Sequence, residues 1–312
     1  MNISVCITTY NEEESIGALL DSLLAQSLKP DEIIIVDGGS SDKTVEIINH
    51  YQKKDRSIKL LKEKCSRAKG RNLGIEIAKN EIIAITDAGC TAHPDWLEKL
   101  TEPFIHKEVD ISAGFYQMKG ESNIQKAMSI YLGVRPDSFD ATFLPSTRSI
   151  AFRREAWEAV GGFPDEDKNS AEDTYFNFHT LKLGMKYARV KTALVEWGMP
   201  KTIGEFYEKI KTYALWDART KIWFFPGKGL TSHNIKALSV ILRYLTGLVL
   251  LVFTFTSPLL PVFLILVFAY FVWAFRKVYL EFKDTKVAIF GPVLQIVSDL
   301  AVMQGFIRGM VG

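Results

Sequence analysis

A run of 32 residues without a charged side chain, from Tyr244 to Phe275, constrains the fold of this 312-residue chain most strongly. As one helix it would be about 48 Å long, whereas the hydrocarbon core of a bilayer is about 30 Å thick. Its middle contains Ser257-Pro258 and Pro261, and proline favours a turn there. The sequence therefore predicts two membrane-spanning helices, at about 238–256 and 259–275.

A third apolar segment follows, from Val287 to Ile307, and Asp299 interrupts it. Gln295 and Asp299 are four residues apart, so they share one face of a helix. The segment is either a third span with an inward polar stripe or an interfacial helix. A buried hairpin in a protein without a membrane is disfavoured, because such helices rarely extend this far without a charge.

Basic residues predict the orientation of these helices. The turn between the first two apolar segments contains no basic residue. The connection between the second and third segments contains four, Arg276, Lys277, Lys283 and Lys286. The positive-inside rule places this connection, and with it the N-terminal part, in the cytoplasm. The first residues also lack the basic and apolar regions of a signal peptide. We therefore expect a multi-pass protein of the cell membrane.

The overall composition averages two unlike parts. The chain has a net charge of +2, 47% hydrophobic residues and 24% charged residues, which is typical of globular proteins. The sequence pI of about 8.2 argues against a nucleic-acid partner. Residues 237–312 have six basic and three acidic side chains, while the rest of the chain has a net charge of −1. We therefore divide the chain into 1–232 and a membrane anchor at 233–312.

The first part alternates between strand-like and helix-like segments. Short strand-like runs at 3–9, 32–36, 58–61 and 82–86 are each followed by a helical pattern, the first of which Asn11 is expected to cap. This alternation predicts an α/β fold with a parallel, doubly wound sheet.

Ligands bind at the carboxyl ends of the strands in such sheets. Polar turns with an acidic residue fall there: Thr8–Glu12, Asp37–Asp42 and Asp87–Cys90. Their convergence indicates a ligand rich in hydroxyl groups or a cation. No phosphate loop and no GxGxxG after the first strand are present, which argues against an NTPase or a dehydrogenase. Arg67 and Arg71, at a helix start, suit a diphosphate, although a solvated basic helix end is the alternative.

Several motifs, in this order, resemble glycosyltransferase family 2 with its GT-A fold. They span about residues 3–220 and read Thr8-Thr9-Tyr10-Asn11-Glu12, Val36-Asp37-Gly38-Gly39-Ser40-Ser41-Asp42-Lys43-Thr44, Gly70-Arg71-Asn72-Leu73-Gly74, Gly161-Gly162-Phe163-Pro164 and Ala171-Glu172-Asp173-Thr174.

The resemblance implies an inverting transferase that uses a nucleotide-diphosphate sugar, with a mixed, mainly parallel sheet and residues 1–232 as the catalytic part. Asp37 matches the nucleoside-binding position, Asp87 the first aspartate of the DxD motif, and Asp173, beside Glu172, the catalytic base. The donor-binding residues we expect are Thr8, Tyr10, Glu12, Asp37, Arg67, Arg71, Asp87 and Arg148.

Inversion needs a carboxylate that takes the proton of the attacking hydroxyl, and positive charge on the departing diphosphate. Asp173 fits the first requirement, although a helix cap is the structural alternative for this residue. A divalent cation, Mn²⁺ or Mg²⁺, would fit the second, with Asp87 as its ligand.

This sequence departs from the family pattern at the DxD motif, which reads Asp87-Ala88-Gly89. The second carboxylate is missing, and a hard cation prefers several oxygen ligands. Arg67, Arg71 and Arg148 are an alternative source of charge for the leaving group. The QxxRW signature of processive synthases is also absent, so we expect a single-addition enzyme.

The anchor favours an acceptor at the bilayer, either a lipid-linked or a cell-envelope glycan with a free hydroxyl. A polyprenyl-phosphate sugar synthase is the close alternative, and its acceptor would be the phosphate itself. A non-catalytic membrane protein that binds nucleotide sugars is disfavoured because both Glu172 and Asp173 are present.

Overall fold

The computed structural model describes residues 1–164, 171–226 and 232–311. The chain forms two compact units. The first contains Met1–Met118 and Pro136–Gly198, and the second contains Lys119–Arg135 and Met199–Gly312. The second unit therefore starts before residue 233, and the division of the chain at 232 stays a prediction about function.

The first unit contains an eight-stranded sheet among the described residues, in the order β3-β2-β1-β4-β7-β6-β8-β5. Its strands are β1 (Ile3–Thr9), β2 (Glu32–Asp37), β3 (Ile58–Lys62), β4 (Ile82–Ile85), β5 (Cys90–Ala92), β6 (Ile111–Lys119), β7 (Ile150–Arg153) and β8 (Tyr187–Gly198).

The sheet is mixed, as the family resemblance implies, whereas the alternation of strands and helices alone predicts a parallel sheet. β1 pairs in parallel with β2 and β4, and β2 pairs in parallel with β3. β7 is antiparallel to β4 and β6, and β5 is antiparallel to β8. The four predicted strands form the parallel half of the sheet, and β1, β2 and β4 are buried on both faces.

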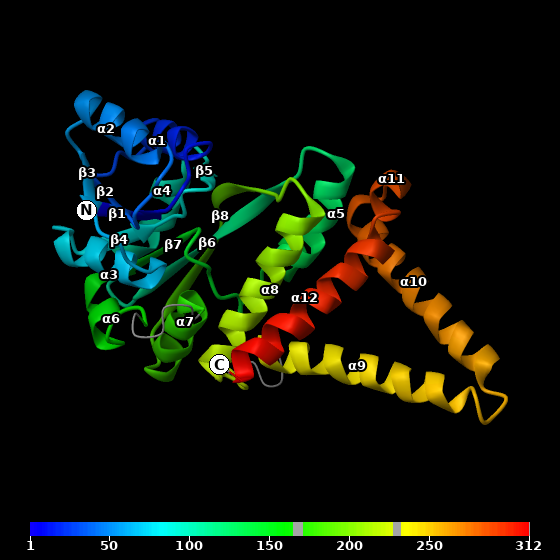
Figure 1. The fold of residues 1–312 in the computed structure, drawn as a ribbon. Helices are drawn as coiled ribbons and strands as arrows, with labels where there is room; N and C mark the ends of the chain where they lie inside the picture. Colours follow the sequence, from blue (N-terminus) through cyan, green and yellow to red (C-terminus); the bar gives the residue numbers. More distant parts are fainter. Residues whose placement is uncertain (165–170, 227–231, 312) are drawn as a thin grey trace. The chain divides into compact units, whose positions relative to one another are not determined.

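Helices cover both faces of the parallel strands, with α1 and α2 on one face and α3 on the other (Figure 1). Alternating side chains explain this: Cys6 of β1 joins the core beneath α3, so Val5 and Ile7 face the other layer. The helical segments of this unit are α1 (Ile16–Leu24), α2 (Thr44–Lys54), α3 (Arg67–Ile77), α4 (Trp96–Thr101), α6 (Arg154–Ala159), α7 (Glu172–Lys182) and short 3₁₀ turns at Glu102–Ile105 and Pro136–Ser138.

The prediction that Asn11 caps the first helix is wrong. α1 begins at Ile16, and Asn11 has a φ of 54°. Its side-chain oxygen accepts a hydrogen bond from the Ser41 N–H at 2.8 Å, while its own N–H donates to Ser40 Oγ at 2.9 Å. Asparagine tolerates this left-handed conformation, so it joins the β1–α1 and β2–α2 loops instead.

The second unit is helical. It contains α5 (Asn123–Leu132), α8 (Ile203–Thr220), α9 (His233–Phe253), α10 (Leu260–Phe282), α11 (Thr285–Ala288) and α12 (Gly291–Val311).

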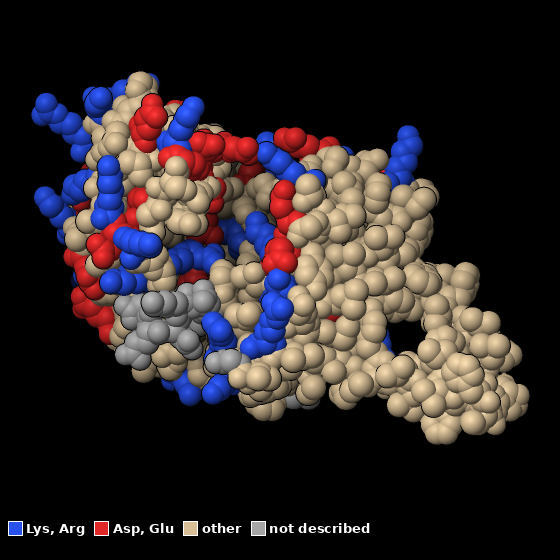
Figure 2. All heavy atoms as spheres, viewed as in Figure 1, with Lys and Arg blue, Asp and Glu red and all other residues tan. Residues whose placement is uncertain are grey.

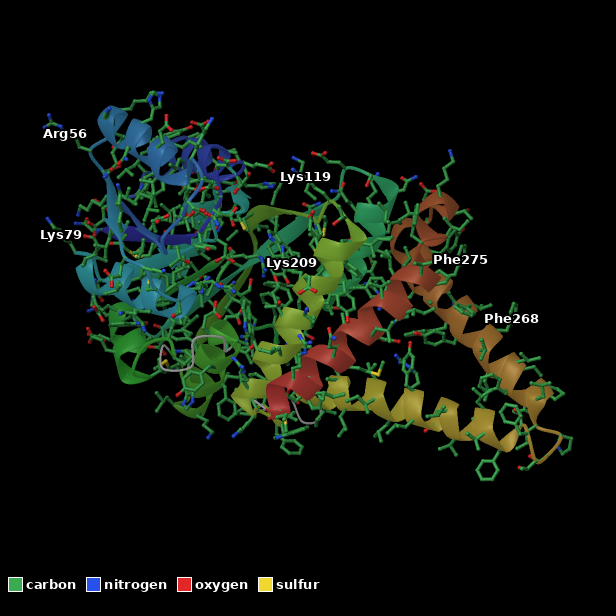
Figure 3. The ribbon with its side chains drawn as sticks, in the orientation of Figure 1. Arg56, Lys79, Lys119, Lys209, Phe268 and Phe275 are labelled. Atoms are coloured by element: carbon green, nitrogen blue, oxygen red, sulfur yellow. The ribbon has the colours of Figure 1, made fainter. Side chains whose placement is uncertain are left out.

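Three helical segments of the described chain are long and apolar enough to cross a membrane: His233–Phe253, Leu260–Phe282 and Thr285–Val311. The first two confirm the predicted pair of apolar helices, and Pro261 lies in the first turn of α10. Both helices are longer than predicted, because polar residues before the first apolar run and after the second are also helical. Figure 2 shows that the surface of the α9–α10 hairpin is almost entirely uncharged. Phe268 of α10 is 70% exposed there (Figure 3).

The polar stripe of α12 faces inward, since Gln295 and Asp299 are buried. α12 also lies unusually close to α8. A Cβ on Gly305 would come within 2.1 Å of the Lys211 carbonyl oxygen, and one on Gly309 within 2.4 Å of the Leu215 carbonyl oxygen. Only glycine allows this backbone approach.

Gly70 permits a similar approach of α3 to β1, because a Cβ at this position would lie 3.0 Å from Thr8 Cγ2. We expect Gly70→Leu to overpack this contact and to lower the free energy of unfolding by about 1–3 kcal/mol in chemical denaturation. Gly17→Ala is the control, because its Cβ would meet no atom closer than 3.8 Å. An equal loss for both variants would contradict the packing argument.

Candidate active site

Arg71 is the centre of the candidate site. α3 begins after Ser66, whose hydroxyl accepts a hydrogen bond from the Lys69 N–H at 3.2 Å. Arg71 follows Gly70, where α3 packs against Thr8 of β1. Only 1% of this side chain is exposed.

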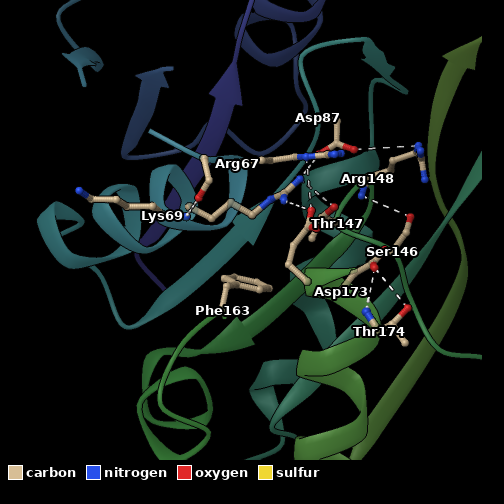
Figure 4. A network of polar contacts seen from close by, with 12 residues as sticks. Arg67, Lys69, Asp87, Ser146, Thr147, Arg148, Phe163, Asp173 and Thr174 are labelled. Atoms are coloured by element: carbon tan, nitrogen blue, oxygen red, sulfur yellow. Dashed lines mark hydrogen bonds and ion pairs between the residues drawn. The ribbon is translucent and has the colours of Figure 1, made fainter. Parts of the chain in front are cut away.

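Arg71 binds groups from separate parts of the first unit (Figure 4). Nη2 donates to Asp87 Oδ1 at 2.7 Å and to Thr147 Oγ1 at 2.9 Å. Nη1 donates to Glu172 Oε1, the residue that begins α7. A buried charge needs such partners, because leaving it unpaired costs several kcal/mol, on the order of 3–5.

The pKa values of this cluster follow from burial and opposite charges. Burial alone would raise the pKa of Asp87, but the guanidinium groups of Arg71, Arg148 and Arg67 hold it below its ordinary value. The pKa of Glu172 is also lowered, because Arg71 and Arg67 outweigh burial. Both side chains are therefore carboxylates at neutral pH.

Arg148 approaches Asp87 from another direction. Its Nε lies 4.0 Å from Asp87 Oδ2. The guanidinium stacks 3.8 Å from the ring centroid of Trp197 and 5.0 Å from that of Tyr116. These rings hold its plane in place, which a lysine would not reproduce. Arg67, which is 39% exposed, lies 3.6 Å from Glu172 Oε1.

Asp173 lies in the first turn of α7 beside this cluster. Its Oδ1 accepts a hydrogen bond from the Thr174 N–H at 2.7 Å. The N-cap residue is Ala171, which makes no side-chain cap bond, so Asp173 is not the N-cap itself, although its carboxylate satisfies one N–H of the first turn. Burial alone would lower the pKa of Arg71, but the negative charges of Glu172, Asp87 and Asp173 raise it above its ordinary value. Asp173 is thus near enough to act on the same guanidinium.

Asp37 lies at the carboxyl end of β2. Its Oδ2 accepts hydrogen bonds from the N–H groups of Gly39 and Ser40, both at 2.9 Å. Its Oδ1 is buried and, within the described part of the chain, has no hydrogen-bond partner. A buried acceptor of this kind usually indicates a missing ligand or water.

The other predicted donor residues lie at the end of β1 and in the following loop. Thr8 is half-buried, and Tyr10 is 63% exposed. Glu12 Oε2 accepts a hydrogen bond from Ser15 Oγ at 2.5 Å. It also lies 3.8 Å from the place where a Cβ of Gly89 would be. The loop thus brings a carboxylate next to the position where this DxD motif lacks one.

The side chains do not fit a cation held by protein ligands alone. Among the residues that the structure describes, no three His, Cys, Asp or Glu side chains gather closely enough to hold a metal ion. Asp87 is the predicted ligand, and arginines lie against both of its oxygens. A hard cation would have to compete with these arginines.

The structure thus brings Arg67, Arg71, Asp87, Arg148 and Glu172 into one network. Sequence reasoning missed Thr147, Trp197 and Tyr116. Thr147 adjoins the Arg148 that was singled out, but the two aromatic residues lie on β8 and β6, whose register no local motif reveals.

The acidic pKa values predict a pH dependence of stability. The folded-state pKa values of Asp87 and Glu172 lie below the ordinary values of 3.8 and 4.5. These two carboxylates therefore stabilise the fold fully above their ordinary pKa values, and this stabilisation is lost as the pH falls through their folded-state pKa values. We expect Glu172→Gln to cost about 3 kcal/mol of unfolding free energy at pH 7, because it leaves Arg71 short of a partner. The difference from the wild type should shrink below pH 4.5.

Glu63→Gln is the control, because Glu63 is 48% exposed and lies 4.0 Å from Lys69. It should change stability by less than about 0.5 kcal/mol. A difference between wild type and Glu172→Gln that stays constant from pH 7 to pH 3.5 would contradict the ion-pair explanation.

This chain resembles known proteins in fold and in sequence. A mannosyltransferase from Pyrobaculum calidifontis, solved with GDP-Man and Mn²⁺, superposes with a TM-score of 0.65 over 99% of this chain and 86% of its own, at 17% identity. This likeness confirms the GT-A fold.

Two curated relatives match part of the chain. A glycosyltransferase of Bacillus subtilis, EpsJ, is 27% identical over 192 residues, which are 58% of this chain and 56% of that protein. The glycosyltransferase AglE of Haloferax volcanii is 28% identical over 170 residues, 52% of this chain and 56% of its own. The chain thus spans about half the length of these relatives.

The family model described as "Glycosyl transferase family 2" matches residues 4–188, more than half of the chain. This range includes Asp37, Arg71, Asp87, Arg148 and Asp173. The chain therefore belongs to glycosyl transferase family 2.

Proposed function

We propose that this protein transfers a sugar, with inversion, from a nucleotide-diphosphate sugar to a hydroxyl acceptor. The observation that carries this proposal is the cluster around Arg71. It brings the DxD aspartate Asp87 and the start of α7, with Asp173, to one place in a family 2 chain.

The donor's nucleoside is proposed to lie against Asp37. The buried Oδ1 of Asp37 accepts no hydrogen bond from the described residues, so an N–H or O–H group of the nucleoside would satisfy it. Thr8, Tyr10 and Glu12 belong to the neighbouring loop and are proposed to contact the same ligand.

Asp173 is the proposed general base. Its carboxylate lies in the first turn of α7, where the helix dipole favours negative charge. It would take the proton of the acceptor hydroxyl as that oxygen attacks the anomeric carbon, and the bond to the diphosphate breaks on the opposite face. Glu172 is proposed to act through Arg71, which it holds in place from the adjacent position.

The diphosphate leaves with additional negative charge. We propose that Arg148 and Arg67 compensate for it, because Arg148 lies beside Asp87 and Arg67 lies beside Glu172. Planar guanidinium groups bind phosphate oxygens in pairs, and Trp197 keeps the plane of Arg148 fixed.

The helices of the second unit support a place at the membrane. α9 and α10 would cross the bilayer, and the basic end of α10 would lie in the cytoplasm, together with the catalytic residues. We propose that α12 lies in the interface, because it packs closely against α8, which has charged side chains along its length. The acceptor is then a lipid-linked or cell-envelope glycan.

Replacement of Asp173 by Asn tests the base. We expect transfer to fall by at least about 100-fold, while the donor still raises the thermal unfolding temperature as it does in the wild type. A phosphate acceptor would need no base, so retained transfer with an acid-labile lipid product would contradict the hydroxyl acceptor. Loss of donor binding would contradict the role of Asp173 itself.

Chelation tests the source of positive charge. We expect the wild type to keep most of its transfer activity in EDTA. Gly89→Asp restores the second carboxylate of the motif, and a Cβ there has room, since the described residues leave only Glu12 Oε2, at 3.8 Å, within 4 Å of it. This variant should become dependent on Mn²⁺. Complete loss of wild-type activity in EDTA, restored by Mn²⁺, would refute the proposal that arginines suffice.

A further inference from the structure

A polar cluster lies among the apolar helices of the second unit. It consists of Arg243 on α9, Tyr270 and Lys277 on α10, and Gln295 and Asp299 on α12. Asp299 Oδ2 accepts hydrogen bonds from Arg243 Nη2 at 2.6 Å and from the Tyr270 hydroxyl at 2.5 Å. Its Oδ1 accepts one from Gln295 Nε2 at 2.9 Å.

The charges of this polar cluster do not balance. Arg243 pairs with Asp299, which is 3% exposed. Lys277, by contrast, has no carboxylate within 4.0 Å among the residues that the structure describes. Its Nζ lies 3.3 Å from Gln295 Oε1, 4.0 Å from the ring centroid of Tyr131 and 5.7 Å from that of Trp273. The cluster therefore has an excess of one positive charge.

The cluster borders an opening. Figure 2 shows a gap through the second unit, enclosed by α9, α10 and α12. The side chain of Arg243 is 39% exposed, although its partner Asp299 is buried. Aromatic rings surround the guanidinium, with centroids 5.9 Å away for Tyr244, 5.5 Å for Tyr270 and 5.8 Å for Trp273. Part of this cation is thus exposed, on a helix that borders the opening.

Arg243 lies on the apolar helix α9, and Lys277 lies near the basic end of α10, where that helix reaches the headgroup region. Arginine and lysine within spanning segments pair with an anion or line a polar cavity. One carboxylate satisfies Arg243, and aromatic rings compensate only partly for the charge of Lys277. An anion that enters the opening would complete the pairing.

We propose that this polar cluster binds the phosphate headgroup of a lipid, with Arg243 and Lys277 as its cationic contacts. The helices also provide a surface for the lipid's chain, because large apolar side chains on their outer faces are exposed: Leu245, Leu248, Leu264 and Phe268. A free anion in water would have no need of this apolar surface. The inference concerns binding alone and does not depend on sugar transfer.

Lys277 is the residue that separates this proposal from a purely structural role. Asp299, Arg243 and Tyr270 hold three helices together, so their replacement would disturb the fold as well as the site. Lys277→Met keeps the length of the side chain and its packing against the aromatic rings, and removes the charge together with the hydrogen bond from Nζ to Gln295 Oε1. Arg276→Met is the matched control, because Arg276 is the adjacent, exposed cation on α10.

The full chain in maltoside micelles would be titrated with dodecyl phosphate, and thermal unfolding would be followed. We expect a saturable rise of the unfolding temperature for the wild type and for Arg276→Met. Lys277→Met should require about tenfold more dodecyl phosphate for the same rise, since one charge-assisted contact is lost. Inorganic phosphate and dodecanol at the same concentrations should produce no shift.

Three results would overturn the proposal. Equal titrations of Lys277→Met and wild type would show that the polar cluster is only structural. An equal effect of inorganic phosphate would indicate a site for a free anion. An equal effect of dodecanol would show that the apolar chain binds without its headgroup.

Discussion

The buried guanidinium of Arg71 is the interaction on which the candidate site depends. It joins Asp87, Thr147 and Glu172, which are 16, 76 and 101 residues away in the sequence. A planar fork with several donors can bind all three partners at once, whereas a lysine would offer a single point charge. Since an unpaired buried charge is strongly destabilising, the folded state places these segments in one arrangement. Asp173 is positioned beside them as a consequence.

The same constraint has a different outcome in the second unit. There Asp299 accepts hydrogen bonds from Arg243, Tyr270 and Gln295, and so joins three helices that are otherwise apolar. In the first unit three carboxylates accompany three arginines. In the polar cluster of the second unit, Arg243 and Lys277 accompany a single carboxylate, that of Asp299. A balanced cluster stabilises a fold by itself, whereas an unbalanced one between membrane helices favours an additional anion.

Local patterns predicted the elements well where one physical cause dominates. The predicted strand segments became β1 to β4, and burial on both faces explains the β-branched residues of β1, β2 and β4. The charge-free run became the α9–α10 hairpin, with its break at the prolines. The prediction for Asn11 was wrong because an asparagine that caps a helix and one that joins two loops stand in the same local sequence pattern. Only the position of Ser41 distinguishes them.

The sequence by itself determined the α/β order, the apolar helices and the polar residues at the strand ends, since these follow from periodicity and from short motifs. Only the tertiary structure decided that Arg148 stacks on Trp197, that Glu12 lies next to Gly89, and that Lys277 faces rings rather than a carboxylate. These contacts join segments far apart in the chain. Their existence depends on strand register and helix packing, which no local pattern encodes.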